Sequence, residues 1–293
     1  MRGRIFILVG LMLCFLSMGA KAVTWTEGDQ KVLREFQAYA REKGLIKLPV
    51  NERVTWIGKF FLGKPYKSGT LNVTAKELPV INLRELDCVT LVENTLALAF
   101  LDDYTGNIEE PFVRNIMKLR YRNAEIQDYT SRLHYSSDWL YEMQRQHLLS
   151  DMTRAEGGKK LPLDICFMTK NYTKYPVLEK DTSLLSKMKV IETAINKRTY
   201  YYIPKAEISG ISGNLEDGDI ILITTNIKGL DTSHLGFALK KGGKVYLLHA
   251  SSTGKKVVIT DVPLEKYMEG ISSQTGIIVG RAGLIEPELL MPD

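Results

Sequence analysis

The sequence predicts an α+β protein in which helices come first and antiparallel strands come last. Two observations predict this class. Apolar residues recur at helical spacing in several stretches before residue 200, whereas residues 215–260 read as short buried strands separated by tight turns. That order is typical of α+β folds. The chain has 293 residues, and its mean hydropathy of −0.11 is that of a soluble globular protein.

The first 22 residues read as a secretory signal peptide. Arg2 and Arg4 precede an uncharged apolar run over residues 5–16, and Ala20-Lys21-Ala22 follows as a small-x-small cleavage signal. The run is too short for a transmembrane helix, and no second run of spanning length follows. We therefore expect an exported protein without stable membrane insertion, in which residues 23–293 form a single domain; the resemblance described below implies the bacterial periplasm.

Charge and cysteine content limit the classes of function that the protein can have. Loss of Arg2, Arg4 and Lys21 with the signal lowers the formal net charge from +5 to +2, which removes the case for a nucleic-acid partner. Cys14 also leaves, so Cys88 and Cys166 remain. An exported protein can pair two such cysteines in a structural disulfide. No CxxC or HExxH spacing occurs, so we expect neither a metal site nor a cofactor.

Local signals place the helices and strands. Thr26 and Asp29 form a capping box before the first helix, and Asp87 is a plausible N-cap for the third. The expected helices cover about residues 27–43, 51–61, 89–100, 137–149 and 178–197, and a further helix begins at residue 109. The expected strands cover about residues 71–74, 80–83, 161–169, 220–224, 233–239, 245–250 and 256–260.

Cys88 is the first candidate for chemistry. It follows Asp87 in the first turn of a helix whose apolar side includes Val89, Val92 and Leu96. A helix N-terminus or a nearby imidazolium can lower a thiol pKa from about 8.5 to roughly 3.5–7.5, and a thiol needs that shift to act as a nucleophile at neutral pH. We therefore expect Cys88 to have a lowered pKa.

Two histidines fall on neighbouring strands. His234 begins one predicted strand and His249 ends the next, and the turn at Gly242-Gly243 makes the two strands antiparallel. By alternation both imidazoles share one face, opposite Leu235 and Leu248. If that face packs against the start of the Cys88 helix, a Cys–His–His relay results. His234 is then the base and His249 orients it. Backbone N–H groups and the Tyr66 hydroxyl are candidate oxyanion donors.

The stretch 121–139 has little periodicity and many side chains able to hold a polar ligand. Arg132 can bind a carboxylate through two hydrogen bonds, and Tyr135 or Trp139 can stack on a sugar or peptide. The alternative is a polar loop with its aromatic side chains packed beneath it.

Several of these motifs together resemble the NlpC-type papain-like cell-wall hydrolases. The motifs in order are Gly63-Lys64-Pro65-Tyr66, Asp87-Cys88, Asp217-Gly218-Asp219, Ser233-His234-Leu235-Gly236 and His249-Ala250. The variants Asp87-Cys88-Val89-Thr90 and Ser131-Arg132-Leu133-His134-Tyr135 resemble the N-acetylmuramoyl-L-alanine amidase-like branch. The resemblance spans about residues 57–284.

The resemblance implies a fold and a set of residue roles. The fold is a papain-like core, with the cysteine helix on an antiparallel sheet or barrel. A helical N-terminal part precedes it, and an insertion over about residues 101–200 shapes the substrate pocket. The catalytic residues would be Cys88, His234, His249 and Tyr66. Asp87, Ser233, Arg132, His134 and Trp139 would bind substrate.

The predicted function is a monomeric cysteine amidase that cuts the N-acetylmuramic acid–L-alanine bond of peptidoglycan fragments. Three alternatives stay open. The same thiol can cleave within the stem peptide, as a D-glutamyl-diaminopimelate endopeptidase in which Asp87 and Ser233 hold a free amine. It can pass the acyl group to an acceptor other than water. Or the protein binds the cell wall without catalysis, and Cys88 and Cys166 form a disulfide.

Overall fold

The computed structural model describes residues 23–72 and 76–283. The predicted signal peptide lies outside these residues. Within them, no helix is long and apolar enough to cross a membrane. The helices are α1 (Glu27–Glu42), α2 (Val50–Phe60), α3 (Cys88–Ala99), α4 (Glu109–Arg120), α5 (Ser136–Arg145), α6 (Phe167–Lys170), α7 (Pro176–Lys180), α8 (Leu184–Asn196), α9 (Ile208–Ile211) and α10 (Leu264–Glu269).

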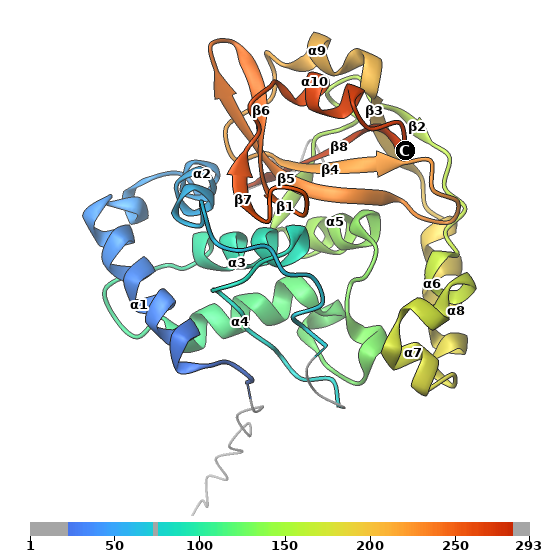
Figure 1. Cartoon of the computed structure of the whole chain (residues 1–293), viewed down its shortest axis with the longest axis horizontal. Helices are drawn as coiled ribbons and strands as arrows, with labels where there is room; N and C mark the ends of the chain where they lie inside the picture. The colour runs from blue at the N-terminus through green and yellow to red at the C-terminus, as the bar shows by residue number, and fades with distance from the viewer. Residues whose placement is uncertain (1–22, 73–75, 284–293) are drawn as a thin grey trace, which may run out of the picture.

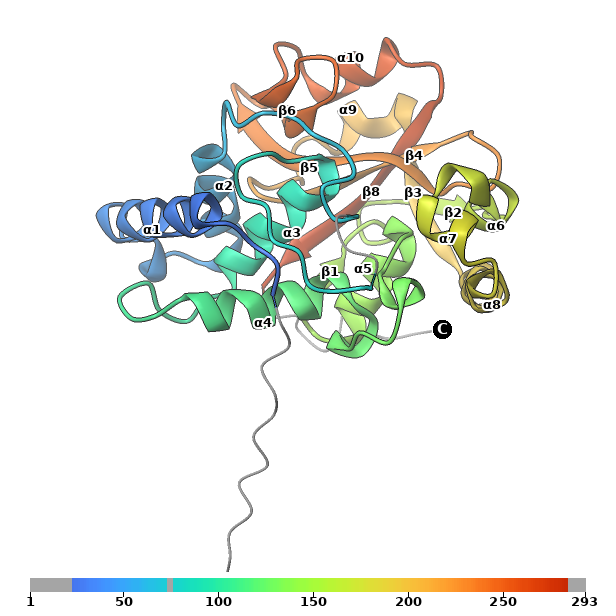
Figure 2. The same ribbon diagram turned by 60° about the horizontal axis from the view of Figure 1, so that its bottom comes forward.

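The strands form one antiparallel sheet and vary in length. The predicted α+β class is therefore confirmed. They are β1 (Leu149–Asp151), β2 (Lys159–Leu161), β3 (Tyr200–Pro204), β4 (Ile220–Thr225), β5 (Thr232–Lys241), β6 (Lys244–Ser251), β7 (Lys256–Ile259) and β8 (Gln274–Ala282). Their order is β2-β3-β8-β4-β5-β6-β7, and β1 also pairs with β8. Both views place α3, α4 and α5 on one side of this sheet and α9 and α10 on the other (Figures 1 and 2).

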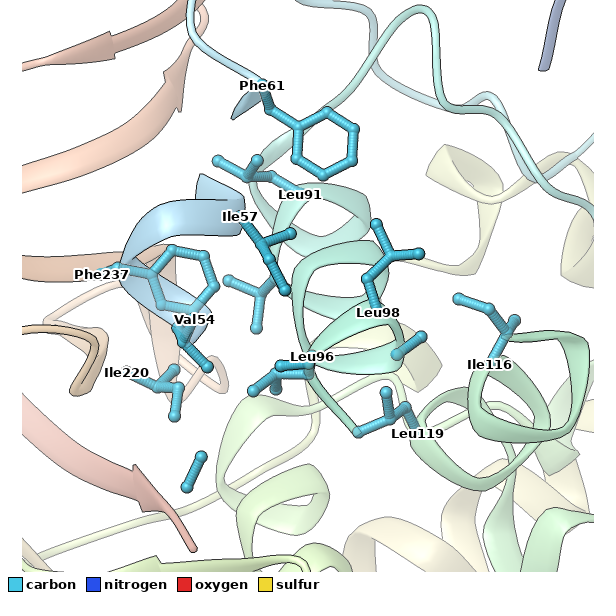
Figure 3. Close-up of a cluster of buried hydrophobic side chains, with 14 of the residues drawn as sticks. Val54, Ile57, Phe61, Leu91, Leu96, Leu98, Ile116, Leu119, Ile220 and Phe237 are labelled. Atoms are coloured by element: carbon cyan, nitrogen blue, oxygen red, sulfur yellow. The ribbon is translucent and has the colours of Figure 1, made fainter. Parts of the chain in front are cut away.

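Alternation along the strands divides the apolar side chains between the two faces. Leu222, Phe237 and Leu248 belong to the main core with α2, α3 and α4 (Figure 3). Ile221, Leu247 and their neighbours form a smaller core under α9 and α10. Helix α3 is buried from Thr90 to Ala99, as expected of a helix that is apolar nearly all round. The sheet and the surrounding helices therefore hold α3 rigidly at the centre of the molecule.

Several predicted elements have the expected form. The Thr26–Asp29 capping box begins α1, and Asp87 caps α3. The four strands β4 to β7 follow the predicted pattern of strands and turns. Val89, however, was expected on the buried stripe of α3 and is 39% exposed.

The two short strands expected before α3 are wrong for the described residues. Leu71 lies in a turn, and residues 73–75 lie outside the described residues. Val80 makes only an isolated bridge with Thr24. The backbone of residues 80–83 is bound by side chains instead: Asp29 accepts from the Leu83 N–H at 3.0 Å, and Asn94 donates to the Asn82 carbonyl at 3.1 Å. These bonds replace a strand ladder.

Three other boundaries differ from prediction. Pro162 follows β2 and cannot donate to a ladder, so the expected strand over 161–169 ends at Leu161 and α6 begins at Phe167. The expected helix over 178–197 is broken because the Asp181 carboxylate accepts from the Ser183 N–H at 3.1 Å, as in an Asx-turn. Helix α5 ends before His147, whose φ of 56° is left-handed.

Strands β1, β3 and β8 were not predicted. β8 is the central strand, paired with β4 along most of its length. Its Ile277-Ile278-Val279 run is buried on both faces and therefore lacks the alternation that marks a half-buried strand.

Candidate active site

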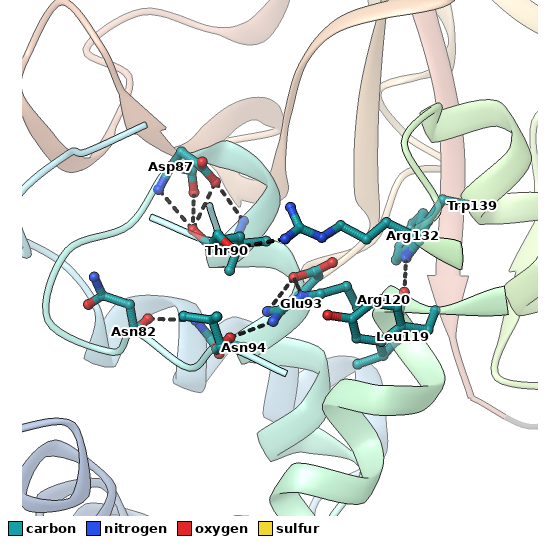
Figure 4. A network of polar contacts seen from close by, with 12 residues as sticks. Asn82, Asp87, Thr90, Glu93, Asn94, Leu119, Arg120, Arg132 and Trp139 are labelled. Atoms are coloured by element: carbon teal, nitrogen blue, oxygen red, sulfur yellow. Dashed lines mark hydrogen bonds and ion pairs between the residues drawn. The ribbon is translucent and has the colours of Figure 1, made fainter. Parts of the chain in front are cut away.

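The N-terminus of α3 is fixed by a reciprocal capping box. Asp87 Oδ1 accepts from the Thr90 N–H and from the Thr90 hydroxyl, both at 2.8 Å, while the Thr90 hydroxyl oxygen accepts from the Asp87 N–H at 2.9 Å (Figure 4). These bonds satisfy donors that a helix start leaves open. They hold Cys88 at the first position of the helix, beside unpaired backbone N–H groups.

Cys88 lies against the backbone of β5. The backbone N–H groups of Leu235, Val89 and Cys88 itself lie close enough to its sulfur to favour the thiolate form. The β5–β6 ladder begins only at Phe237 and Leu248, so β6 does not pair with this end of β5. Cys88 is thereby placed beside the residue that follows His234.

The expected lowering of the Cys88 pKa is wrong for this structure. Burial and the Asp87 carboxylate raise the pKa of the Cys88 thiol to about 12, and the backbone N–H groups only partly oppose them. The thiol is therefore protonated at rest. It needs a base at the moment of attack rather than a permanent thiolate.

The hairpin brings the two imidazoles into contact, as the spacing predicts. His234 Nε2 and His249 Nδ1 are 2.6 Å apart, and the rings meet edge to face with centroids 4.8 Å apart. Gly236 makes room between them, because a Cβ there would lie 2.7 Å from the Leu248 carbonyl and 3.0 Å from the His249 Cβ. His234 Nε2 is occupied by this contact. The other ring nitrogen, His234 Nδ1, has no hydrogen bond to any described residue.

Burial lowers the pKa of both histidines. The pKa of His234 falls to about 3, with a further contribution from the charge of His249, and that of His249 falls to about 4. Both rings are therefore neutral at neutral pH, and His234 is available as a proton acceptor. The face differs from expectation, because α3 packs on the side of β5 that carries Leu235 and Phe237 rather than on the side of the histidines.

Two tyrosines border this group. Tyr66 forms a bridge with Leu86, and burial raises its pKa with contributions from Cys88 and Asp87. Tyr267 of α10 lies against His249 with ring centroids 5.4 Å apart, and its pKa is raised by burial and by Cys88. Tyr267 was not predicted, because the position of α10 depends on the tertiary fold and no local motif marks it.

A cavity of about 200 Å³ adjoins the α3 N-terminus. Four of the predicted substrate residues line it: Asp87, Arg132, His134 and Trp139. Cys88, His234, His249, Tyr66 and Ser233 are not among its lining residues, although Asp87, Val89 and Leu235 connect the cavity to Cys88 and His234. Ser233 is exposed beside His234.

The cavity residues have roles that the sequence did not reveal. Arg132 donates through Nε to Glu77 at 2.5 Å, through Nη1 to Asn72 at 2.8 Å and through Nη2 to the Leu71 carbonyl at 2.9 Å. The guanidinium is thus already bound on all three nitrogens. Because Nη1 and Nη2 each carry a second N–H, the expectation that Arg132 holds a substrate carboxylate stays a prediction.

The two aromatic rings of the cavity are also fixed by the protein. Trp139 is 5% exposed, and its indole N–H donates to the Leu119 carbonyl at 2.8 Å (Figure 4). His134 Nε2 lies 2.9 Å from the Tyr129 carbonyl, and burial lowers the pKa of His134 to about 4. Tyr135 is buried and donates to Glu192 at 2.8 Å, so it is part of the core rather than a stacking surface.

Glu93 and Arg120 are cavity residues that sequence reasoning missed. Arg120 donates to Glu93 Oε2 through Nε at 2.8 Å and lies 2.7 Å from it through Nη2, and its Nη1 donates to the Val80 carbonyl at 2.5 Å. Both side chains are buried. An acid on a nearly continuous apolar helix was the signal that could have identified Glu93.

Both cysteines are free, so the alternative with a Cys88–Cys166 disulfide is wrong for this structure.

The fold and this site together define an α+β protein with a helix-start cysteine and a histidine pair on two neighbouring strands of an antiparallel sheet. The family model described as AmiA-like, N-acetylmuramoyl-L-alanine amidase-like, matches residues 56–277. The chain belongs to this amidase-like family. The family assignment supports a hydrolase with a peptidoglycan amidase-like role.

Solved structures agree with this assignment. An N-acetylmuramoyl-L-alanine amidase from Bacteroides uniformis is 39% identical, with a TM-score of 0.76 over 78% of this chain and 98% of that chain. A second structure of an amidase from that organism is 38% identical, with a TM-score of 0.75 over 80% of this chain and 98% of the other. A Legionella pneumophila protein shares the fold at 22% identity, with a TM-score of 0.65 over 89% of this chain and 96% of that one. No curated protein matches the chain significantly.

Proposed function

We propose that this protein is an exported cysteine amidase that hydrolyses the bond between N-acetylmuramic acid and L-alanine in peptidoglycan fragments. The observation that carries the proposal is the hydrogen bond between His234 Nε2 and His249 Nδ1, which leaves His234 Nδ1 open, while the N–H of Leu235, the next residue, lies near the Cys88 sulfur. A nucleophile, a base and an orienting group are the parts of a catalytic triad.

In this mechanism the thiol proton of Cys88 moves to His234 Nδ1 as the sulfur attacks the lactyl carbonyl carbon. The N–H groups of Cys88 and Val89, with Tyr66 nearby, stabilise the oxyanion. The C–N bond breaks when His234 gives its proton to the leaving amine of L-alanine, and a thioester remains. Water then adds to the thioester and His234 accepts its proton. As the C–S bond breaks, His234 returns this proton to the Cys88 sulfur, and the muramoyl carboxylic acid is released. His249 accepts a hydrogen bond from His234 Nε2 throughout and keeps the ring oriented.

The neutral resting state suits this sequence of steps. Because the pKa of Cys88 is raised and that of His234 is lowered, thiol and imidazole are both uncharged before substrate binds. Charge separates only in the transition state, where the oxyanion donors act.

The finer placement is part of the same proposal. Packing of the cysteine helix on the strands that carry the histidines supports a papain-like core of the NlpC type. Export to the periplasm rests on residues 1–22 of the sequence, and the substrate, peptidoglycan fragments, rests on the family. We propose that the protein acts as a monomer.

The test is mass spectrometry of the products from a purified disaccharide-tetrapeptide, with Cys88→Ala as the control. Free disaccharide and intact tetrapeptide, absent with Cys88→Ala, are expected. A disaccharide-dipeptide and a dipeptide would instead indicate the endopeptidase, in which Asp87 and Ser233 hold a free amine. Full activity of Cys88→Ala would refute the cysteine mechanism. Product linked to an added amine or sugar acceptor would indicate acyl transfer.

A further inference from the structure

The cavity beside the α3 N-terminus presents carboxylate oxygens to a bound ligand. Its guanidinium nitrogens, in contrast, all have protein partners. One oxygen of Glu93 receives both contacts from Arg120, and Figure 4 shows no contact at its second oxygen. Asp87 uses Oδ1 for the Thr90 cap. Among the described residues, neither Glu93 Oε1 nor Asp87 Oδ2 has a hydrogen-bond donor.

Every guanidinium nitrogen of the two cavity arginines already has a protein acceptor. Arg120 uses its three nitrogens on Glu93 and the Val80 carbonyl. Arg132 uses its three on Glu77, Asn72 and the Leu71 carbonyl. His134 is neutral at neutral pH, since burial lowers its pKa to about 4. A ligand carboxylate placed here would therefore face two carboxylates, and the arginines that it could approach already share their charge with protein acceptors.

Most of the remaining wall is apolar, apart from Asn72 and Ser136. Val89, Val92 and Leu235 line one side, and the fixed ring of Trp139 lines another. A group that suits this cavity combines an N–H or O–H donor with an apolar part. An acetamido group has both, in its N–H and its methyl. The stem peptide of a muropeptide, in contrast, carries several free carboxylates.

We propose that Glu93 is a specificity residue that accepts a hydrogen bond from the acetamido N–H of the muramoyl sugar, and that Arg120 positions it. This inference rests on the proposed amidase function and adds the direction of the substrate. The sugar lies in the cavity lined by Glu93 and Trp139, and the peptide leaves on the side away from it.

The test compares two substrates with unmodified protein. One is a muramoyl-tripeptide with the natural 2-acetamido group, and the other has a 2-O-acetyl group of nearly the same shape without the N–H. A hydrogen bond to a charged acceptor contributes enough that kcat/KM is expected to fall about ten- to a hundredfold for the 2-O-acetyl substrate. Equal kcat/KM for the two substrates would overturn the proposal.

A variant pair links the preference to Glu93. Glu93→Met with Arg120→Met removes the acceptor without leaving a buried single charge, and is expected to treat the two substrates alike. Glu142→Gln, at another buried carboxylate outside the cavity, is the matched control and is expected to keep the full preference. A double variant that folds and still prefers the acetamido substrate would contradict the role of Glu93.

Two further outcomes separate this inference from the proposed function. If unmodified protein cleaves neither substrate, the amidase function fails. If it cleaves both equally at the sugar–peptide bond, only the role of Glu93 fails. Competition by an L-alanyl peptide with a free amine, lost in the double variant, would make the cavity an ammonium site and overturn the acetamido assignment.

Discussion

The two halves of the candidate site are built in different ways. The histidine pair comes from one hairpin, and its geometry follows from strand register alone. The cavity comes from segments far apart in the sequence, and buried ion pairs join them: Arg120 to Glu93 across 27 residues, and Arg132 to Glu77 across 55. The comparison teaches that the hairpin half depends on local packing, whereas the cavity half depends on buried charges that are paired across distant segments.

The largest expected effect is on catalysis at the hairpin. His234→Ala removes the proposed base and should lower kcat/KM by about 10³- to 10⁴-fold, which is about 4–5.5 kcal/mol of transition-state stabilisation. The thermal unfolding midpoint should change little. His147→Asn is the control, because Asn tolerates the left-handed φ of 56° at that position. Activity of His234→Ala near that of the control would show that the hairpin does not supply the base.

The next effect concerns folding of the cavity half. Arg120→Met leaves the Glu93 carboxylate buried without its partner, and should lower the free energy of unfolding by about 3–5 kcal/mol. Glu93→Met added to Arg120→Met should recover much of this loss, because no unpaired charge then remains. Denaturant unfolding measures both variants. A double variant no more stable than the single one would mean that the pair is not what holds this half together.

A smaller effect tests the close packing of the hairpin. Gly236→Ala adds a Cβ that would lie 2.7 Å from the Leu248 carbonyl and 2.8 Å from Leu247 Cδ1. Relief of such overlap typically costs about 1–3 kcal/mol, and activity should fall as the two imidazoles separate. Gly213→Ala is the matched control, since a Cβ there meets nothing within 4 Å. Equal stability of the two variants would show that the strands adjust without cost.

The contrast between the hairpin and the cavity also explains how much of the fold and of the candidate site could be predicted from the sequence. The capped helix, the hairpin strands and the contact of His234 with His249 follow from local patterns, because turn position and alternation determine them. Central strand β8 was missed, because burial on both faces removes its alternation. The Cys88 pKa was predicted in the wrong direction, since burial and Asp87 outweigh the helix N-terminus.

The cavity shows most clearly which features of the site cannot be predicted from sequence. Arg132 was identified as a carboxylate binder from its residue type alone, but its partners Glu77, Asn72 and Leu71 come from a separate segment. Sequence shows which charged groups a chain contains, whereas only the tertiary fold shows which of them the protein has already paired. For the same reason Glu93 was not predicted, although its position on an apolar helix was visible.

The smallest expected effect is on the pH dependence of the free energy of unfolding, to which the cavity half and the hairpin half each contribute a histidine. His134 in the cavity and His249 in the hairpin both have a pKa lowered by burial to about 4, from about 6.5 when unfolded. The unfolded chain therefore binds more protons between these values, so the free energy of unfolding must fall as pH drops from about 6.5 to 4.

His134→Phe removes one titrating group and the contact with the Tyr129 carbonyl. At neutral pH we expect a loss of about 1 kcal/mol, and a shallower decline towards pH 4. His249→Phe should flatten the decline similarly but also reduce activity, because the hairpin half carries the proposed base. An unchanged pH slope in His134→Phe would mean that the cavity histidine is solvated enough to keep its ordinary pKa, and the acid sensitivity would then belong to the hairpin alone.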